Sequence, residues 1–358
     1  MSKLNIISIF PDLKLPRPII ISGPCSAETE VQTIDTAKAL SESGIKIFRA
    51  GIWKPRTRPR VFEGVGKKGL IWLKKVKNET GMKVCVEVAC KLHVRQVIES
   101  EIDAVWIGSR TSVNPFVVQE IADALVGSDL TVFVKNPVSP DLDLWIGALE
   151  RINGAGITKL AAIHRGFSVY GHSKYRNPPQ WQIPIELRRQ IPNLPILTDP
   201  SHICGNRDLL REISQEAMDL NFDGLMIESH INPTESWSDS QQQVSPSMLK
   251  KIVDSLLIRN PNSENKTDEK LNEYRKQIDV VDYQLIDLLK ERMNISEIIG
   301  KLKHENNLTI FQSNRYKELL EKRTELAQQT GLNPDFIEKI FKLIHEESVN
   351  KQNDVMNR

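Results

Sequence analysis

The sequence predicts a closed (β/α)8 barrel over residues 1–259 and an all-α domain of three helices over residues 267–358, with a linker at 260–266. Eight short apolar runs alternate with segments of helical periodicity over about 240 residues, the usual size of such a barrel. After residue 266 glycine nearly disappears, and apolar residues recur at helical spacing instead.

The expected strands are short runs rich in Ile, Val and Leu, which is typical of buried parallel strands. They lie at residues 19–22, 46–49, 83–88, 104–107, 131–135, 159–163, 196–198 and 224–227. Helices are expected at 29–43, 69–80, 92–100, 115–125, 142–153, 207–220 and 246–258, with a short one at the end of the less regular stretch 170–190. A doubly wound open sheet is the alternative, but no glycine-rich dinucleotide turn follows the first run.

The linker is polar, contains Pro261 and has no apolar residue. It is followed by a helical pattern of more than 30 residues, longer than a typical globular helix without a partner. A second helix is expected at about 313–329. A third starts after Asn333-Pro334, a cap followed by an N1 proline, and runs to about Val355. Three helices of such unequal length do not enclose a core alone, so we expect two copies to intertwine as a homodimer.

Composition excludes several classes of protein. The net charge of +2 gives no general bias toward nucleic acid or membrane, and we expect neither as a partner. Four cysteines without a C-x-x-C pattern favour a reducing cytosol. The apolar stretch 4–10 lacks the basic region and cleavage site of a signal peptide, and no run of about 18 apolar residues exists. We therefore expect a cytoplasmic protein.

Four possible metal ligands are scattered along the barrel segment: Cys25, His202, Glu228 and Asp239. Three of them follow apolar runs and so fall at the carboxyl ends of strands, which form the catalytic face of a βα barrel. A thiolate, an imidazole and two carboxylates together suit a divalent transition metal such as Mn²⁺. The alternative is a buried cysteine, a capping aspartate and two polar loop residues.

Cationic residues also gather at or just beyond the ends of expected strands. They are Arg49, Lys54, Arg56, Arg110, Lys135 and Arg165. Six cations converging on one barrel opening repel one another unless anions bind there. Arginine binds phosphate or carboxylate in bidentate fashion, and lysine supplies a compact charge. Each residue alone could be a solvated loop residue, but the set predicts phosphorylated substrates.

The motifs Gly-Pro-Cys-Ser, Lys-Pro-Arg-Thr, Ile-Gly-Ser-Arg-Thr, Lys-Asn-Pro, Asp-Pro-Ser-His and Ser-Asp-Ser-Gln resemble the compact form of type I 3-deoxy-D-arabino-heptulosonate 7-phosphate (DAHP) synthase. The resemblance covers residues 18–258. It implies a metal-dependent condensation of phosphoenolpyruvate with erythrose 4-phosphate. The family's usual Ser-Asp-Gly is Ser238-Asp239-Ser240 here. A sister enzyme acting on arabinose 5-phosphate is the nearest alternative, but its loop typically reads Lys-Ala-Asn-Arg-Ser.

The resemblance also implies roles for individual residues. The metal ligands would be the four residues named above, and phosphoenolpyruvate would contact Arg49, Arg110, Lys135 and Arg165. Lys54, Arg56 and Thr57 would form the aldose-phosphate loop, with Lys54 reaching both substrates. Lys135 or a nearby histidine would transfer a proton. His164 is the nearest histidine by sequence, and His172 and His230 stay open.

Residues 267–354 resemble the all-helical chorismate mutase family, which needs cations facing a dicarboxylate substrate. The residues that carry the match are Arg275, Arg292, Lys303, Arg315, Ser348 and Gln352. Arg275 and Arg292 are about 26 Å apart along one helix, so one of them would serve the site of a second copy. The usual Asp before the second helix is Gln312, and the usual Glu after its arginine is Tyr316.

This second resemblance implies conversion of chorismate to prephenate, with arginines binding the carboxylates and Lys303 and Gln352 stabilising the ether oxygen. The alternative is that the helical domain is mainly a regulatory dimerisation module that binds chorismate or prephenate. The two interpretations can coexist, and the fusion predicts feedback inhibition of the barrel by either compound.

Overall fold

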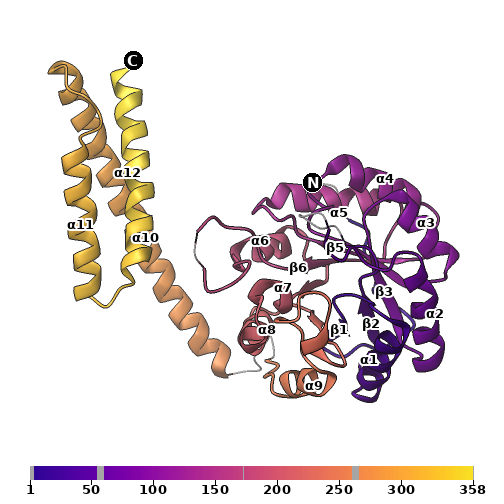
Figure 1. The fold of residues 1–358 in the computed structure, drawn as a ribbon. Helices are drawn as coiled ribbons and strands as arrows, with labels where there is room; N and C mark the ends of the chain where they lie inside the picture. Colours follow the sequence, from indigo (N-terminus) through magenta and orange to yellow (C-terminus); the bar gives the residue numbers. More distant parts are fainter. Residues whose placement is uncertain (1–3, 55–59, 172, 260–265, 358) are drawn as a thin grey trace. The chain divides into compact units, whose positions relative to one another are not determined.

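A computed structural model of the chain describes residues 4–54, 60–171, 173–259 and 266–357 (Figure 1). Arg56, Thr57, His172 and the linker positions 260–265 therefore lie outside the described residues. The chain divides into two compact units, Met1–Pro261 and Asn262–Arg358. No described helix is long and apolar enough to cross a membrane.

The first unit contains the closed parallel barrel that the sequence predicts. Its strands are β1 (Ile19–Gly23), β2 (Ile47–Ala50), β3 (Lys83–Val88), β4 (Ala104–Ile107), β5 (Thr131–Lys135), β6 (Leu160–His164), β7 (Ile196–Thr198) and β8 (Gly224–Glu228). Each strand pairs with the next, and β1 pairs with β8 from Ile19 opposite Gly224 to Gly23 opposite Glu228. The carboxyl ends of all eight strands therefore open on one face of the barrel.

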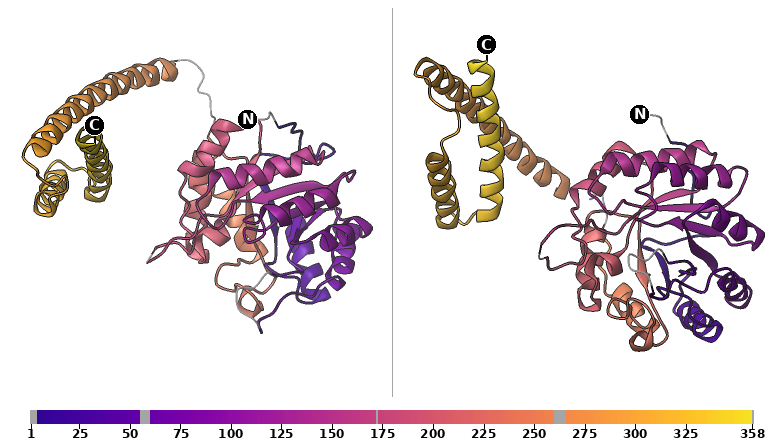
Figure 2. Two further views of the ribbon diagram at one scale, coloured as in Figure 1. Left: turned by 90° about the horizontal axis from the view of Figure 1, so that it is seen from above. Right: turned by 45° about the horizontal axis from the view of Figure 1, so that its top comes forward.

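Helices surround the sheet (Figure 2). They are α1 (Glu30–Glu42), α2 (Lys68–Thr80), α3 (Lys91–Glu99), α4 (Pro115–Leu125), α5 (Leu142–Gly154), α6 (Gln182–Gln190), α7 (Pro200–Cys204), α8 (Leu210–Asp219) and α9 (Pro246–Asp254). Side-chain caps explain several starts. Asn114 caps α4 and Asp141 caps α5 by accepting backbone N–H groups of the first turn. The short helix α7 was not predicted, and Gly205, with φ of 65°, ends it.

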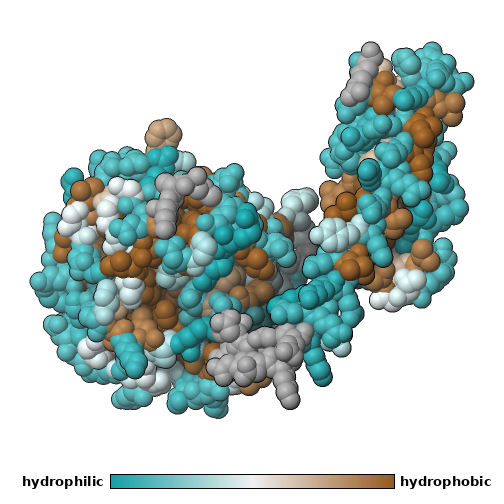
Figure 3. Space-filling model, turned by 180° about the vertical axis from the view of Figure 1, so that it is seen from behind, coloured by the Kyte–Doolittle hydropathy of each residue, from teal (hydrophilic) through white to brown (hydrophobic). Residues whose placement is uncertain are grey.

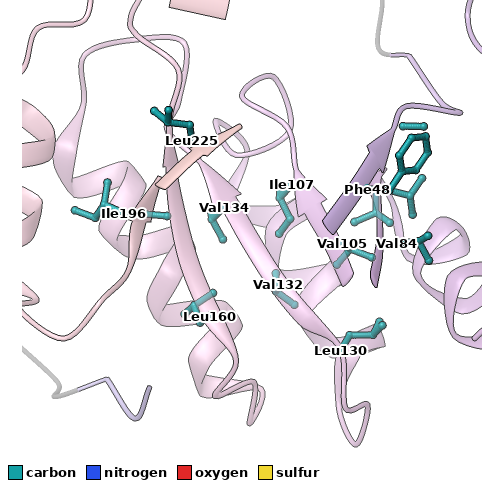
Figure 4. Packing of buried hydrophobic residues seen from close by; sticks show 14 of the residues in the cluster. Phe48, Val84, Val105, Ile107, Leu130, Val132, Val134, Leu160, Ile196 and Leu225 are labelled. Atoms are coloured by element: carbon teal, nitrogen blue, oxygen red, sulfur yellow. The ribbon is translucent and has the colours of Figure 1, made fainter. Parts of the chain in front are cut away.

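The barrel has two apolar layers because side chains alternate along each strand. On β4, Trp106 belongs to the cluster inside the barrel, whereas Val105 belongs to the cluster shared with the surrounding helices. Figure 4 shows part of this outer layer, with Val105, Val132 and Leu160 on neighbouring strands. These filled layers fix the strands firmly. The polar residues that follow the strands are therefore held in defined positions at the open face.

The second unit consists of α10 (Lys266–Glu305), α11 (Ser313–Gln329) and α12 (Pro334–Met356), so its first helix has 40 residues. Helix α12 packs against both α10 and α11. Large apolar side chains stay exposed along α10, among them Tyr274, Ile278, Val281, Leu285 and Leu288. Apolar surface is visible on this unit in Figure 3. One copy of the three helices leaves these side chains in contact with water.

Candidate active sites in the two units

The four possible metal ligands lie near one another at the open face of the barrel. Cys25 follows β1, His202 lies on α7, Glu228 ends β8 and Asp239 lies in the loop after β8. The Cys25 Sγ atom is 3.2 Å from Asp239 Oδ2, and His202 Nε2 is 3.9 Å from Glu228 Oε1. Within the described parts of the chain, no three or more His, Cys, Asp or Glu side chains lie close enough together to hold a metal ion in this arrangement. The four residues therefore form two pairs, Cys25 with Asp239 and His202 with Glu228.

Two cations lie against these donors. Lys54 Nζ donates a hydrogen bond to Cys25 Sγ at 2.9 Å, and Arg49 Nη1 is paired with Glu228 Oε1 at 3.1 Å. Burial, followed by the Glu228 carboxylate, raises the pKa of Cys25 to about 12. At neutral pH Cys25 is therefore a protonated thiol, and the negative charge beside Arg49 is that of the Glu228 carboxylate.

The donor set fits a divalent transition metal. It offers one thiol, one imidazole and two carboxylates, which are ordinary ligands of such ions. His202 Nδ1 lies 2.8 Å from Asp199 Oδ2, which leaves Nε2 directed at the other donors. A carboxylate close to the second ring nitrogen of a histidine is typical of metal sites. We infer that these residues could hold the metal that the sequence predicts.

Further polar side chains contact the possible metal ligands, and these side chains were not identified from the sequence. Gln242 Nε2 donates to Glu228 Oε2 at 2.7 Å, and Gln242 Oε1 accepts from Arg176 Nη1 at 2.9 Å. Arg176 Nη1 also donates to Asp239 Oδ1 at 3.0 Å. One chain of contacts therefore joins two possible ligands. Asp239 itself has a φ of 49°, an unusual backbone conformation for a residue other than glycine.

Five of the predicted cations line one cavity of about 80 Å³. They are Arg49, Lys54, Arg110, Lys135 and Arg165, and the same cavity is lined by Glu87, Trp106, His202 and Asp239. Arg49, Lys135 and Arg165 are buried. Burial lowers the pKa of Arg165 to about 10, so this side chain is still charged at neutral pH. Clustered buried cations of this kind suit a ligand with several negative charges.

Asp199 connects the cationic cavity to the possible metal ligands. Its Oδ2 atom is 2.6 Å from Lys135 Nζ and 2.8 Å from His202 Nδ1. Burial alone would raise the pKa of Asp199, but His202 and Lys135 hold that pKa well below its usual value. The carboxylate is therefore ionised. Its position directly before Pro200-Ser201-His202, at the end of β7, is the only signal by which the sequence could have identified it.

The histidines considered for proton transfer lie elsewhere. His164 is buried, with Nε2 2.7 Å from the Pro179 carbonyl oxygen, and burial lowers its pKa to about 3. His230 is also buried, with Nε2 3.4 Å from Glu28 Oε2. Neither residue lines the cationic cavity, whereas Lys135 does. Of the described candidates for proton transfer, Lys135 has the better position.

The helical unit has a cavity of its own, of about 430 Å³. Its lining includes five residues expected at a mutase site: Arg292, Lys303, Arg315, Ser348 and Gln352. Gln312, Tyr316 and His345 line it as well. Arg292 Nη1 donates to Ser348 Oγ and to the Ile344 carbonyl oxygen.

Burial lowers the pKa of Arg292 and of Lys303, because it disfavours their charged forms. Arg275 does not line this cavity, and its Nη1 atom donates to Asn272 Oδ1 one turn away at 3.1 Å.

Comparison with known proteins decides the family. Residues 14–257 match the model of the DAHP synthetase I family. The chain belongs to that family. Residues 274–353 match the chorismate mutase type II model, so a second domain follows the DAHP synthase domain.

Similar proteins cover both domains. A phospho-2-dehydro-3-deoxyheptonate aldolase from Thermotoga maritima is 32% identical over 234 residues, which are 65% of this chain and 67% of that protein. A crystal structure of the Thermotoga maritima DAHP synthase matches with a TM-score of 0.63 and 30% identity, covering 70% of this chain and 72% of that chain. A bifunctional chorismate mutase/prephenate dehydratase from Buchnera aphidicola is 36% identical over 85 residues, 24% of this chain and 22% of that protein.

The chorismate mutase domain departs from its family's pattern in a localised way. Gln312 and Tyr316, which replace the usual carboxylates, both line the cavity beside Arg315. The cationic residues of the match are retained. The departure is therefore confined to the part of the cavity beside Arg315, and Arg292, Lys303 and Gln352 line the same cavity.

Replacing Gln242 with leucine in the DAHP synthase domain should weaken metal binding by about 10- to 100-fold, the usual cost of losing a group that orients a ligand. Leucine has a similar size but cannot donate to Glu228 or accept from Arg176. Competition with a metal-sensitive dye would give the dissociation constant for Mn²⁺. Gln241→Leu is the matched control, because the Gln241 side chain is exposed. Equal Mn²⁺ affinity in the two variants would contradict this role of Gln242.

Proposed function

We propose that residues 1–259 condense phosphoenolpyruvate with erythrose 4-phosphate, and that residues 267–358 convert chorismate to prephenate. The observation that supports the first activity is the cavity lined by five cations together with His202 and Asp239, the second of which contacts Cys25 Sγ. The observation that supports the second is a separate cavity lined by Arg292, Lys303 and Gln352. The chain is thus a bifunctional enzyme with one site in each unit.

In the barrel, Arg49, Arg110, Lys135 and Arg165 bind the phosphate and carboxylate of phosphoenolpyruvate. Cys25, His202, Glu228 and Asp239 would hold a divalent metal, which would supply Lewis-acid polarisation of the aldehyde. The reaction joins C3 of phosphoenolpyruvate to the aldehyde carbon. Water then adds at C2, and phosphate leaves. Lys135 is placed to transfer a proton, because it lines the cavity while Asp199 holds its ammonium group.

The aldose phosphate is bound by the loop after β2. Lys54 reaches from this loop into the cavity, and Arg56 and Thr57 follow it in sequence. We expect turnover with erythrose 4-phosphate and at most weak turnover with arabinose 5-phosphate. A coupled phosphate-release assay with each aldose, with and without a chelator, tests both the substrate and the metal. Activity that persists after complete metal removal would contradict the metal-dependent assignment.

In the helical unit, Arg292 and, from a second copy, Arg275 bind the two carboxylates of the substrate. Arg315 and Ser348 also contact the substrate, and Lys303 and Gln352 stabilise the ether oxygen as the C–O bond breaks. Arg275 serves the site of a second copy. The apolar side chains exposed on α10 support this arrangement, because a second copy would cover them.

Inhibition of the barrel by prephenate or chorismate is the regulatory part of this proposal. Removing residues 260–358 should abolish such inhibition, because the proposed inhibitor site is removed with them. Initial DAHP synthesis rates at increasing prephenate concentration would measure this effect. The full-length variant Arg292→Ala should show the same loss, which excludes an indirect effect of truncation. Undiminished inhibition in both variants would refute the proposal.

A further inference from the structure

Three aromatic rings gather at the helical cavity. Tyr316 and His345 have ring centroids 4.4 Å apart with an interplanar angle of 32°. Phe311 lies 5.9 Å from Tyr316 and 6.3 Å from His345. Tyr316 and His345 belong to α11 and α12, and both line the cavity. The contact with Tyr316 therefore limits the orientations that the imidazole ring can take.

His345 Nε2 is shielded from water and has no hydrogen-bond partner. Gln352 Oε1, which lines the same cavity, is in the same condition. Buried polar atoms are rarely left unpaired in native proteins, because desolvation costs free energy that no partner offsets. The two residues that carry these atoms line one cavity, so a ligand bound there can supply the missing partners.

The surroundings of His345 favour the neutral form of its imidazole. Burial is the main cause that lowers the pKa of His345, and the charges of Arg292 and Lys303 lower it further. A neutral imidazole has one nitrogen that accepts a hydrogen bond. A hydroxyl group is a suitable donor to that nitrogen. An anionic group of the ligand, by contrast, would pair with Arg292 or Arg315, which line the same cavity.

We propose that His345 accepts a hydrogen bond from the ring hydroxyl of the substrate, with Tyr316 positioning the imidazole. This inference rests on the proposed mutase function of the cavity. It explains how the site recognises a hydroxyl although Gln312 and Tyr316 replace the carboxylates usual in the family. His345 is thus a substrate-binding residue, and Tyr316 is a positioning residue.

The test compares chorismate with an analogue that has hydrogen in place of the ring hydroxyl. In the full-length protein, His345→Ala should reduce kcat/KM for chorismate by about tenfold, as expected for one lost hydrogen bond. The same substitution should leave kcat/KM for the analogue within about twofold, because the analogue has no donor to lose. His345→Gln, which keeps an acceptor, should recover part of the loss. Glu346→Ala is the control, because the neighbouring Glu346 side chain is exposed.

Equal losses for chorismate and for the analogue would overturn the proposal, because they would mean that His345 is only structural. Calorimetric binding of both compounds to the same variants separates this proposal from the proposed function. If the wild-type chain bound chorismate without turning it over, the mutase assignment would fail. The His345 proposal would then be tested by binding alone: it requires that His345→Ala weakens the binding of chorismate more than the binding of the analogue.

Discussion

Replacing Cys25 with serine should reduce DAHP synthesis by more than about 100-fold, since even residues that only orient a metal ligand typically contribute 10- to 100-fold. Serine has the same shape, but its hydroxyl is a much poorer ligand for a transition metal than a thiolate. Cys25 Sγ lies between Asp239 Oδ2 at 3.2 Å and Lys54 Nζ at 2.9 Å, so the change removes the sulfur from the centre of the proposed site.

Three measurements check this prediction: the DAHP synthesis rate, the bound metal after equilibration with Mn²⁺, and chorismate turnover. The first two should fall together, and the third should stay unchanged because Cys25 lies in the other unit. Cys90→Ser is the control, because Cys90 is a free cysteine that does not line the cationic cavity. A Cys25→Ser enzyme with normal metal content and normal synthesis would remove Cys25 from the ligand set.

Replacing Arg292 with alanine should lower kcat/KM for chorismate by about 10²- to 10³-fold, the usual cost of losing one preorganised donor at a reacting site. The guanidinium is directed by Ser348 and the Ile344 carbonyl oxygen, so its orientation is fixed before a substrate arrives. Arg292→Lys keeps the charge but loses the bidentate geometry, and we expect an intermediate rate.

The decline in absorbance as chorismate is consumed would provide the rates for these variants. Thermal unfolding followed by circular dichroism controls for loss of structure. If Arg292→Lys were no more active than Arg292→Ala, the positive charge alone would contribute nothing, and the expected intermediate rate would be wrong. Wild-type activity in both variants would place the site elsewhere.

The strands were predictable because buried parallel strands are short runs of β-branched and other apolar residues. The strand expected at 19–22 spans Ile19–Gly23 in the structure, and the strand expected at 131–135 has the bounds that were predicted. Most candidate site residues of the barrel could be located for the same reason, because they lie at or just beyond the carboxyl ends of these apolar runs. Helix α7 was missed because five residues are too few to show helical periodicity.

The supporting residues of the site could not be predicted, since their roles depend on partners distant in sequence. Gln242 and Arg176 are 66 positions apart and become neighbours only when the barrel closes. Nothing in the sequence around His345 distinguishes it from a surface histidine of an amphipathic helix. Only the shielding of its Nε2 atom and its contact with Tyr316 identify it.

A single oxygen atom of Asp199, Oδ2, lies 2.6 Å from Lys135 Nζ and 2.8 Å from His202 Nδ1. When an anion draws the Lys135 ammonium toward itself, the charge on that oxygen becomes more available to the imidazole, which makes Nε2 a stronger ligand. Bound phosphoenolpyruvate should therefore increase the affinity of these residues for the metal. Thermodynamic linkage then requires the metal to increase phosphoenolpyruvate affinity by the same factor. The two should load cooperatively, and the metal-free enzyme should bind phosphoenolpyruvate more weakly than the metal-loaded enzyme does.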